Sequence, residues 1–244
     1  MADDVKGNRN LFLIAAGVLA LGIVIGGYLL GDGLRRARMA DRAVTMRGLA
    51  ERNVTADLAT WNISFGVQGT DLAAVQADVE HDTATVREFF RRAGFPADVI
   101  TDGGGSINSN YDNDRQATVY NINRRLQFRT TDVMRARAAY ARQFDLIRAG
   151  VPLQEGSNMV YSFTRLNAIK PAMIHDSTLD ARRGAEQFAN DSGTTVGGIR
   201  AATQGYFSIG ARDGDSTSEE GGGGAGDSPF QKVRVVTTIE FYLN

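Results

Sequence analysis

Hydrophobic residues recur along the chain with two different periods, which predicts a fold of both strands and helices. The clearest strand pattern alternates apolar with polar or small residues, so that one face is buried and the other is wet. Its apolar members are Ala59, Trp61, Ile63, Phe65 and Val67. The same alternation closes the chain at residues 233–241. Further predicted strands cover residues 44–50, 117–129, 158–166 and 196–209.

Three segments instead repeat apolar residues at helical spacing. The first is capped by Thr70-Asp71 and runs to about Ala93, where Gly94 follows as a stop signal. The second spans about residues 132–149 and the third begins at Pro171, a residue suited to a first helical turn. The apolar stripe of the second helix comprises Val133, Ala136, Tyr140, Phe144 and Ile147. The stripe of the third comprises Ile174, Thr178, Ala181, Ala185 and Phe188.

These elements predict an α+β fold, a mixed or antiparallel sheet with three helices packed on one face. Residues 103–116, which open with Gly103-Gly104-Gly105 and are rich in Asn and Asp, predict a loop. Arg124 interrupts the apolar face of its strand, which predicts an exposed or edge position. Residues 211–228 are Gly, Ser, Asp and Glu with almost no apolar residue, which predicts a mobile hairpin connection.

An uncharged apolar run near the N-terminus predicts a membrane anchor at residues 11–31. The twenty residues from Leu11 to Leu30, at about 1.5 Å each, reach roughly 30 Å, the thickness of a bilayer's hydrocarbon core. A cleaved signal peptide is the alternative, but its apolar region is shorter and ends in a small-residue site. Residues 1–10 then form a tail, 32–42 a connector and 43–244 the folded domain.

The flanking charges leave the orientation of this anchor open. Four arginines follow it, which favours a cytoplasmic domain, yet long domains cross a membrane regardless of such charges. Two glycine pairs in the anchor, Gly22 with Gly26 and Gly27 with Gly31, have the four-residue spacing that lets membrane helices approach closely. They predict self-association in the bilayer, although glycine is common in membrane helices anyway.

The composition of the chain excludes several kinds of functional site. The chain has no cysteine, which excludes disulfides, thiol catalysis and cysteine-bound metals. Its net charge of -1 gives no pull toward nucleic acid. The two histidines, His81 and His175, have no converging ligands in the sequence, so we expect solvated helix-surface residues and no metal or cofactor. No nucleophile or acid–base pair can be identified, so an enzyme is the least favoured of the functional classes.

Several of these segments together resemble the SIMPL domain family. The strand Val44-Thr45-Met46-Arg47-Gly48-Leu49-Ala50 is similar to that family's opening V-x-V-x-G-x-A strand, and Asp57 follows it. The third helix, around Ala181 and Ala185, resembles the family's A-x-x-x-A-x-x-x-A helix. Two features depart from the pattern: Ala56 stands where a proline is usual, and the 211–228 loop is longer.

The resemblance implies a bacterial cell-envelope protein without a cofactor, held in the inner membrane with its folded domain in the periplasm. It also implies a role in envelope or oxidative stress tolerance and, in some members, assembly into rings. From the sequence we therefore expect a non-enzymatic protein whose partners are copies of itself and the lipid bilayer. The alternative is an envelope binding module for a small ligand, a peptide or a protein partner.

Overall fold

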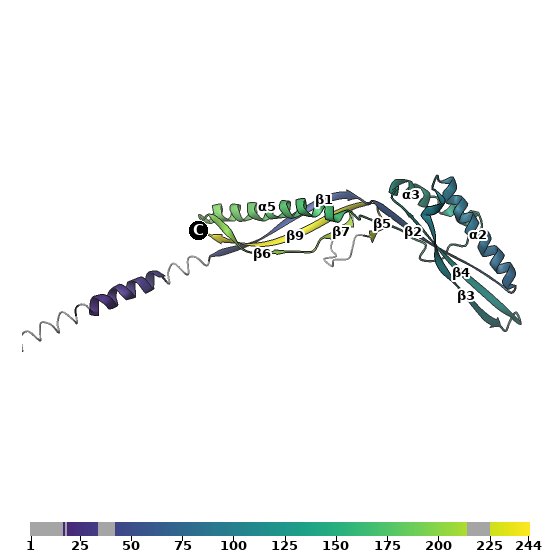
Figure 1. Ribbon diagram of the computed structural model, residues 1–244, viewed down its shortest axis with the longest axis horizontal. Helices are drawn as coiled ribbons and strands as arrows, with labels where there is room; N and C mark the ends of the chain where they lie inside the picture. Colours follow the sequence, from purple (N-terminus) through teal and green to yellow (C-terminus); the bar gives the residue numbers. More distant parts are fainter. Residues whose placement is uncertain (1–16, 18, 34–41, 214–224) are drawn as a thin grey trace, which may run out of the picture. The chain divides into compact units, whose positions relative to one another are not determined.

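The chain folds into two compact units, each of which contains strands and helices (Figure 1). The computed structural model describes residue 17 and residues 19–33, 42–213 and 225–244. One unit is built from Met1–Leu49, Asp176–Gly205 and Val236–Asn244, and the other from Ala50–His175 and Tyr206–Val235.

A five-stranded antiparallel sheet forms the body of the Ala50–His175 unit. Its strand order is β3-β4-β2-β5-β8. The bounds are β2 (Leu58–Gly69), β3 (Ile100–Asp112), β4 (Ala117–Thr130), β5 (Met159–Ser162) and β8 (Ala225–Gly226). The helical elements of this unit are α2 (Leu72–Arg92), the short 3-10 helix η1 (Ala97–Val99), α3 (Val133–Tyr140) and α4 (Phe144–Arg148).

Aromatic side chains fill the core between that sheet and its helices. Trp61 and Phe128 lie opposite each other on β2 and β4 and are fully buried. Phe90 of α2 stacks on Phe128 with ring centroids 4.3 Å apart, and it meets Trp61 edge to face at 5.5 Å. Such ring pairs add about 0.5–1.5 kcal/mol beyond the area they bury. This core fixes α2 against the sheet.

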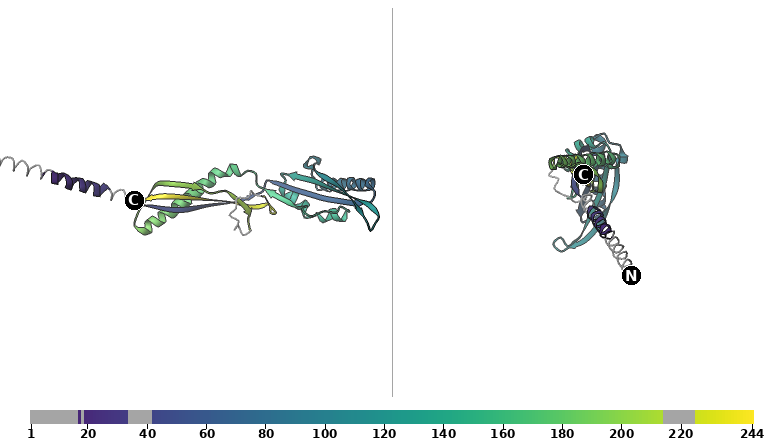
Figure 2. Two further views of the ribbon diagram at one scale, coloured as in Figure 1. Left: turned by 90° about the horizontal axis from the view of Figure 1, so that it is seen from below. Right: turned by 90° about the vertical axis from the view of Figure 1, so that its left-hand side faces the viewer.

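A four-stranded sheet contains β1 (Ala43–Thr55), β9 (Phe230–Leu243) and β6 (Val196–Gln204) in the order β1-β9-β6, and β7 (Ser208–Ala211) also pairs with β9. The long helix α5 (Leu166–Ser192) runs along this sheet (Figures 1 and 2). In the Met1–Leu49 unit, Ala181 and Ala185 of α5 pack on Ile239 and Phe241 of β9.

Small residues bring α5 unusually close to β1. A Cβ placed on Gly48 would lie 1.8 Å from the carbonyl oxygen of Ser177 and 2.8 Å from the Cβ of Ala181. The Leu49 amide donates to the Asp180 carboxylate at 2.9 Å, and the hydroxyls of Ser177 and Thr237 lie 2.7 Å apart in the core. Gly48 and Ala181, two of the residues behind the family resemblance, therefore lie in one packing contact.

The α+β class predicted from the sequence is confirmed, with antiparallel strands, but the elements lie on two sheets instead of one. The strands predicted at residues 44–50, 117–129 and 233–241 are present as β1, β4 and β9. The prediction of a loop at residues 103–116 is wrong for residues 103–112, which belong to β3 (Ile100–Asp112), and only residues 113–116 form a turn. Arg124 lies on β4, between β3 and β2, so its predicted edge position is also wrong.

Two predicted helices differ from the observed ones. The second is split into α3 and α4 by a tight turn, in which the Gln143 amide donates to the Tyr140 carbonyl and the Asp145 amide to the Arg142 carbonyl. The turn shifts the buried stripe, so that Leu146 is buried while Phe144 and Ile147 are 62% and 48% exposed.

The third predicted helix begins earlier than Pro171. The structure starts α5 at Leu166 and places Pro171 inside it. The buried positions of α5 are Met173, Ser177, Ala181, Ala185 and Ala189, whereas Phe188, predicted to be buried, is 46% exposed.

The predicted membrane anchor falls only partly on described residues. Residue 17 and residues 19–33 are helical, whereas residues 11–16 and 18 lie outside the described part of the chain. Within the described part, no helix combines the length and hydropathy that a membrane crossing requires. The central residues of the predicted 211–228 connection, 214–224, also lie outside it.

Candidate assembly edge and ligand groove

The outer edge of β3 is an open edge of the five-stranded sheet. β3 is the terminal strand of that sheet, paired on one side with β4 from Asp112 opposite Ala117 to Ile100 opposite Phe128. Among the described residues no strand pairs with its other side. Every residue from Thr101 to Tyr111 is exposed.

The side chains of β3 do little to protect this edge. Natural edge strands are usually kept from pairing by lysines, prolines, bulges or short length. β3 has 13 residues, contains neither lysine nor proline, and has a single register shift, between Asp102 and Gly105. Beyond Gly105 it is a regular strand that offers free backbone groups to another strand.

Two large apolar side chains project from the regular part of β3. Ile107 is 59% exposed and Tyr111 is 63% exposed. Ile107 lies opposite the buried Ile122 of β4, and Tyr111 lies opposite Thr118. Because alternate residues of a strand share a face, Ile107, Ser109 and Tyr111 lie on the side of the sheet that faces the core. The sequence prediction missed these residues. The available signal was the spacing of Ile107 and Tyr111, which lie four positions apart and therefore on one face of a strand.

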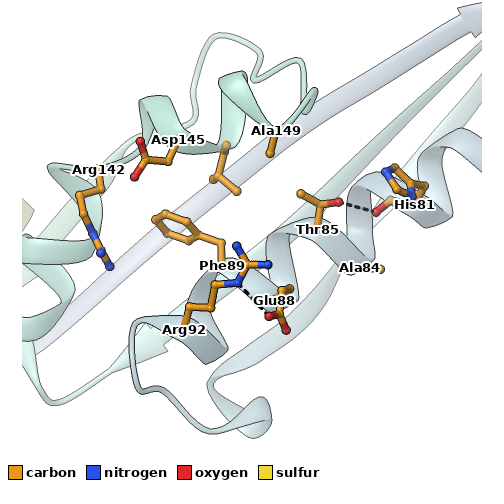
Figure 3. Close-up of a pocket in the computed structure, with 10 residues that line it drawn as sticks. His81, Ala84, Thr85, Glu88, Phe89, Arg92, Arg142, Asp145 and Ala149 are labelled. Carbon is orange, nitrogen blue, oxygen red and sulfur yellow. Dashed lines mark hydrogen bonds and ion pairs between the residues drawn. The ribbon is translucent and has the colours of Figure 1, made fainter.

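A groove of about 510 Å³ between α2 and the α4 segment is the second candidate site (Figure 3). Its apolar lining comes from Ala84 and Phe89 of α2 and from Leu146 and Ala149. Polar groups surround this lining, and Arg142 and His81 lie at opposite ends (Figure 3).

A carboxylate shared by two arginines forms one wall of the groove. Glu88 accepts from Arg91 Nε at 2.6 Å and from Arg92 Nε at 2.9 Å. Hydrogen bonds from Arg91 and then Arg92 lower the pKa of Glu88 to about 2. Glu88 is therefore ionised at neutral pH and is already neutralised by its own helix. It is unsuited to act as a proton donor or acceptor there.

Arg142 is the cation of the groove that has no carboxylate partner within the described residues. Its guanidinium lies 6.0 Å from the centre of the Phe89 ring. The other nearby acid, Asp145, is held by Arg148 at 2.9 Å. The groove thus combines an apolar lining with an available guanidinium, which suits an anionic group attached to an apolar body.

Asp57, named in the family resemblance, has a structural position. Its Oδ1 accepts from the Thr164 amide at 2.8 Å and the Thr164 hydroxyl at 3.0 Å, and its Oδ2 accepts from Arg165 Nε at 2.8 Å. Burial alone would raise the pKa of Asp57, but the hydrogen bonds from Thr164 and Arg165 together bring it below the ordinary value. Asp57 ties the start of β2 to the segment that follows β5.

The other site residues considered from the sequence are not brought together. Gly22, Gly26, Gly27 and Gly31 lie in the helix of residues 19–33, and a Cβ on any of them would meet no atom within 4 Å. His81 and His175 are both exposed. No group of three or more His, Cys, Asp or Glu able to hold a metal ion occurs among the residues that the structure describes.

Comparison with known families gives one match. The model of the SIMPL family, described as a protein of unknown function (DUF541), matches residues 44–241. No curated protein matches the chain. The matched region contains β3, the groove, Asp57 and the contact between Gly48 and α5.

Proposed function

Because the chain belongs to the SIMPL family, we propose that it is a membrane-anchored protein of the bacterial cell envelope that associates with copies of itself. In this proposal it performs no catalysis. It sits in the inner membrane with residues 43–244 in the periplasm, and it supports tolerance of envelope or oxidative stress.

The open edge of β3 is the observation that carries self-association. A regular, exposed strand whose outer edge has no strand partner among the described residues is a template for another strand. The proposed role needs only such a contact surface. A closed ring requires a further contact besides a two-fold pair, and the paired glycines of the anchor are our candidate for it.

The apolar helix near the N-terminus supports anchoring. Its large apolar side chains are 51% to 74% exposed and have no protein surface to cover them in the described chain. They are Leu19, Leu21, Ile23, Val24, Ile25, Tyr28, Leu29 and Leu30. Exposing so many apolar side chains to water is unfavourable, and burial in hydrocarbon removes that cost.

Fractionation and cross-linking of intact membranes test this proposal. The full-length chain should stay in the membrane pellet after alkaline carbonate washing, and protease added outside the inner membrane should digest residues 43–244. An amine cross-linker should give ladders of homo-oligomers. Recovery of the full-length chain in the wash, or a single uncross-linked band, would contradict it.

The groove supports a second candidate function, a binding module for an amphipathic carboxylate. The carboxylate would pair with Arg142 while its apolar part covers Phe89 and Leu146. Decanoate should bind in calorimetry while decanol does not, and Arg142→Gln should abolish the difference. Arg87→Gln is the matched control, because Arg87 is exposed on α2 outside this groove. Equal binding of decanoate and decanol would exclude this assignment.

A further inference from the structure

We propose that a second copy of the chain pairs its own β3 antiparallel with β3, about a two-fold axis at Ser109. This inference rests on the proposed self-association and names its contact surface. Residues 106–112 of one copy would face residues 112–106 of the other. The two five-stranded sheets would then continue into one sheet.

The backbone supplies the first reason for this pairing. Residues 106–112 pair with β4 without interruption, from Ser106 opposite Asn123 to Asp112 opposite Ala117. They follow the register shift that ends at Gly105. Their outward N–H and C=O groups have no strand partner among the described residues. Antiparallel pairing with an equally regular strand would satisfy these groups.

The spacing of the two exposed apolar residues makes the strand complementary to itself. Ile107 and Tyr111 lie on one face and are equally distant from Ser109. A two-fold axis through Ser109, perpendicular to the sheet, sets Ile107 of each copy directly opposite Tyr111 of the other. Aromatic residues opposite β-branched residues are favourable cross-strand pairs, worth about 0.2–1 kcal/mol each relative to alanines. The contact occurs twice.

Neighbouring registers are less favourable. An axis at Asn108 sets Tyr111 against Gly105 and Ile107 against Ser109, so the apolar side chains are not paired directly. An axis at Ile107 sets Ile107 against itself and leaves Tyr111 opposite the irregular segment before Gly105, so fewer residues pair and Tyr111 has no apolar partner. The Ser109 register instead places Asp112 opposite Ser106 and opposes no like charges.

A seven-residue pairing is a small interface, so its strength depends on local concentration. Tethering copies to one membrane raises their effective concentration relative to free solution. The interface is therefore expected to be occupied on the membrane and to loosen on dilution in detergent. In this proposal, occupancy of the β3 edge therefore depends on the anchor.

Cysteine cross-linking reads this register directly, because the chain has no cysteine of its own. Ser109→Cys in the full-length protein, in membranes, should react with a short bis-methanethiosulfonate reagent to give a band at twice the 26.3 kDa chain mass. Gln68→Cys, on an exposed residue of β2, is the control that should stay at the chain mass. Asn108→Cys and Asn110→Cys should cross-link faster when the two variants are mixed than when each is alone.

Two outcomes overturn the inference. If Ser109→Cys gives no more dimer than Gln68→Cys while the amine cross-linker still gives homo-oligomer ladders of the wild-type chain, self-association stands and β3 is not the interface. If a cross-link forms between Ser109→Cys and a different protein instead of a second copy, the edge binds an extended segment of that protein. Failure of both the ladder and the Ser109→Cys dimer would refute the proposed function as well.

Discussion

Gly48 of β1 lies so close to Ser177 of α5 that a methyl group on the glycine would sit 1.8 Å from the Ser177 carbonyl oxygen. The second nearest atom is also a backbone atom, because the Ala181 amide nitrogen would lie only 2.5 Å from that methyl group. Neither element can therefore yield by turning a side chain. The close approach of these two backbones explains both the glycine in the opening strand and the small residues of the helix.

Gly48→Ala should lower the free energy of unfolding by about 3 kcal/mol, the upper end of the usual cost of overpacking. The change adds one methyl group where only a backbone shift can admit it. Urea unfolding of the detergent-solubilised full-length chain, followed by circular dichroism, measures the effect. Gly184→Ala is the matched control, because its Cβ would meet only the Met46 sulfur at 3.7 Å. It should be neutral or stabilise by up to about 1 kcal/mol. Equal stability of the two variants would contradict the contact.

Asp57→Asn should destabilise the chain by about 1–3 kcal/mol at neutral pH, because it removes the charge that accepts from Thr164 and Arg165. The pKa of Asp57 is lowered in the folded chain. Its contribution is therefore complete above the unfolded pKa of about 3.9 and is lost as pH falls through the folded value.

The difference in unfolding free energy between wild type and Asp57→Asn should accordingly shrink as pH falls below about 4. Urea titrations from pH 7 to pH 2 measure it. Asp114→Asn serves as the control, since Asp114 is an exposed turn residue. A difference that stays constant across this range would show that the ionised carboxylate is not what stabilises this junction.

An introduced charge pair should restore dimer formation in the proposed register of β3. Ile107→Lys and Tyr111→Glu each replace an exposed apolar side chain, so either change alone should reduce dimer formation in membranes. In the double variant I107K/Y111E, a cation of one copy faces an anion of the other at both positions, so dimer should return. Cross-linking of Ser109→Cys in each background measures dimer. Absence of rescue, with both single variants impaired, would point to a different register.

Helix contacts in the anchor make a separate prediction. Gly22→Leu combined with Gly26→Leu should weaken self-association in the membrane, because the bulk blocks close approach of two helices on that face. Val24→Leu adds bulk on the opposite side and is the control. Energy transfer between labelled copies in vesicles provides the measurement. If the paired leucines leave the transfer unchanged, the Gly22/Gly26 face is not a contact.

The best-predicted elements were those whose pattern depends on burial alone. Ala59, Trp61, Ile63 and Phe65 alternate without exception, and all four are fully buried on β2. Asp71 caps α2 as expected by accepting from the Ala73 amide. In these places one face of the element packs on a core, so the spacing of apolar residues in the sequence matches the geometry of the strand or helix.

The failures have physical causes as well. β3 is poor in residues that favour strands and looks like a loop, but its pairing with β4 supplies the order that its own sequence does not. The split between α3 and α4 depends on a turn at residues 141–143 that no glycine or proline marks. The sequence also missed the proposed interaction edge, because an edge strand buries few side chains and so leaves a weak hydrophobic pattern.

The molar mass of the full-length, detergent-extracted protein tests the central claim most directly. Light scattering coupled to size exclusion, with the detergent contribution subtracted, should give a mass above 26.3 kDa at micromolar concentration that falls toward 26.3 kDa on further dilution. Ile107→Lys should lower that mass. A protein mass of 26.3 kDa for the wild type across the same concentrations would contradict self-association.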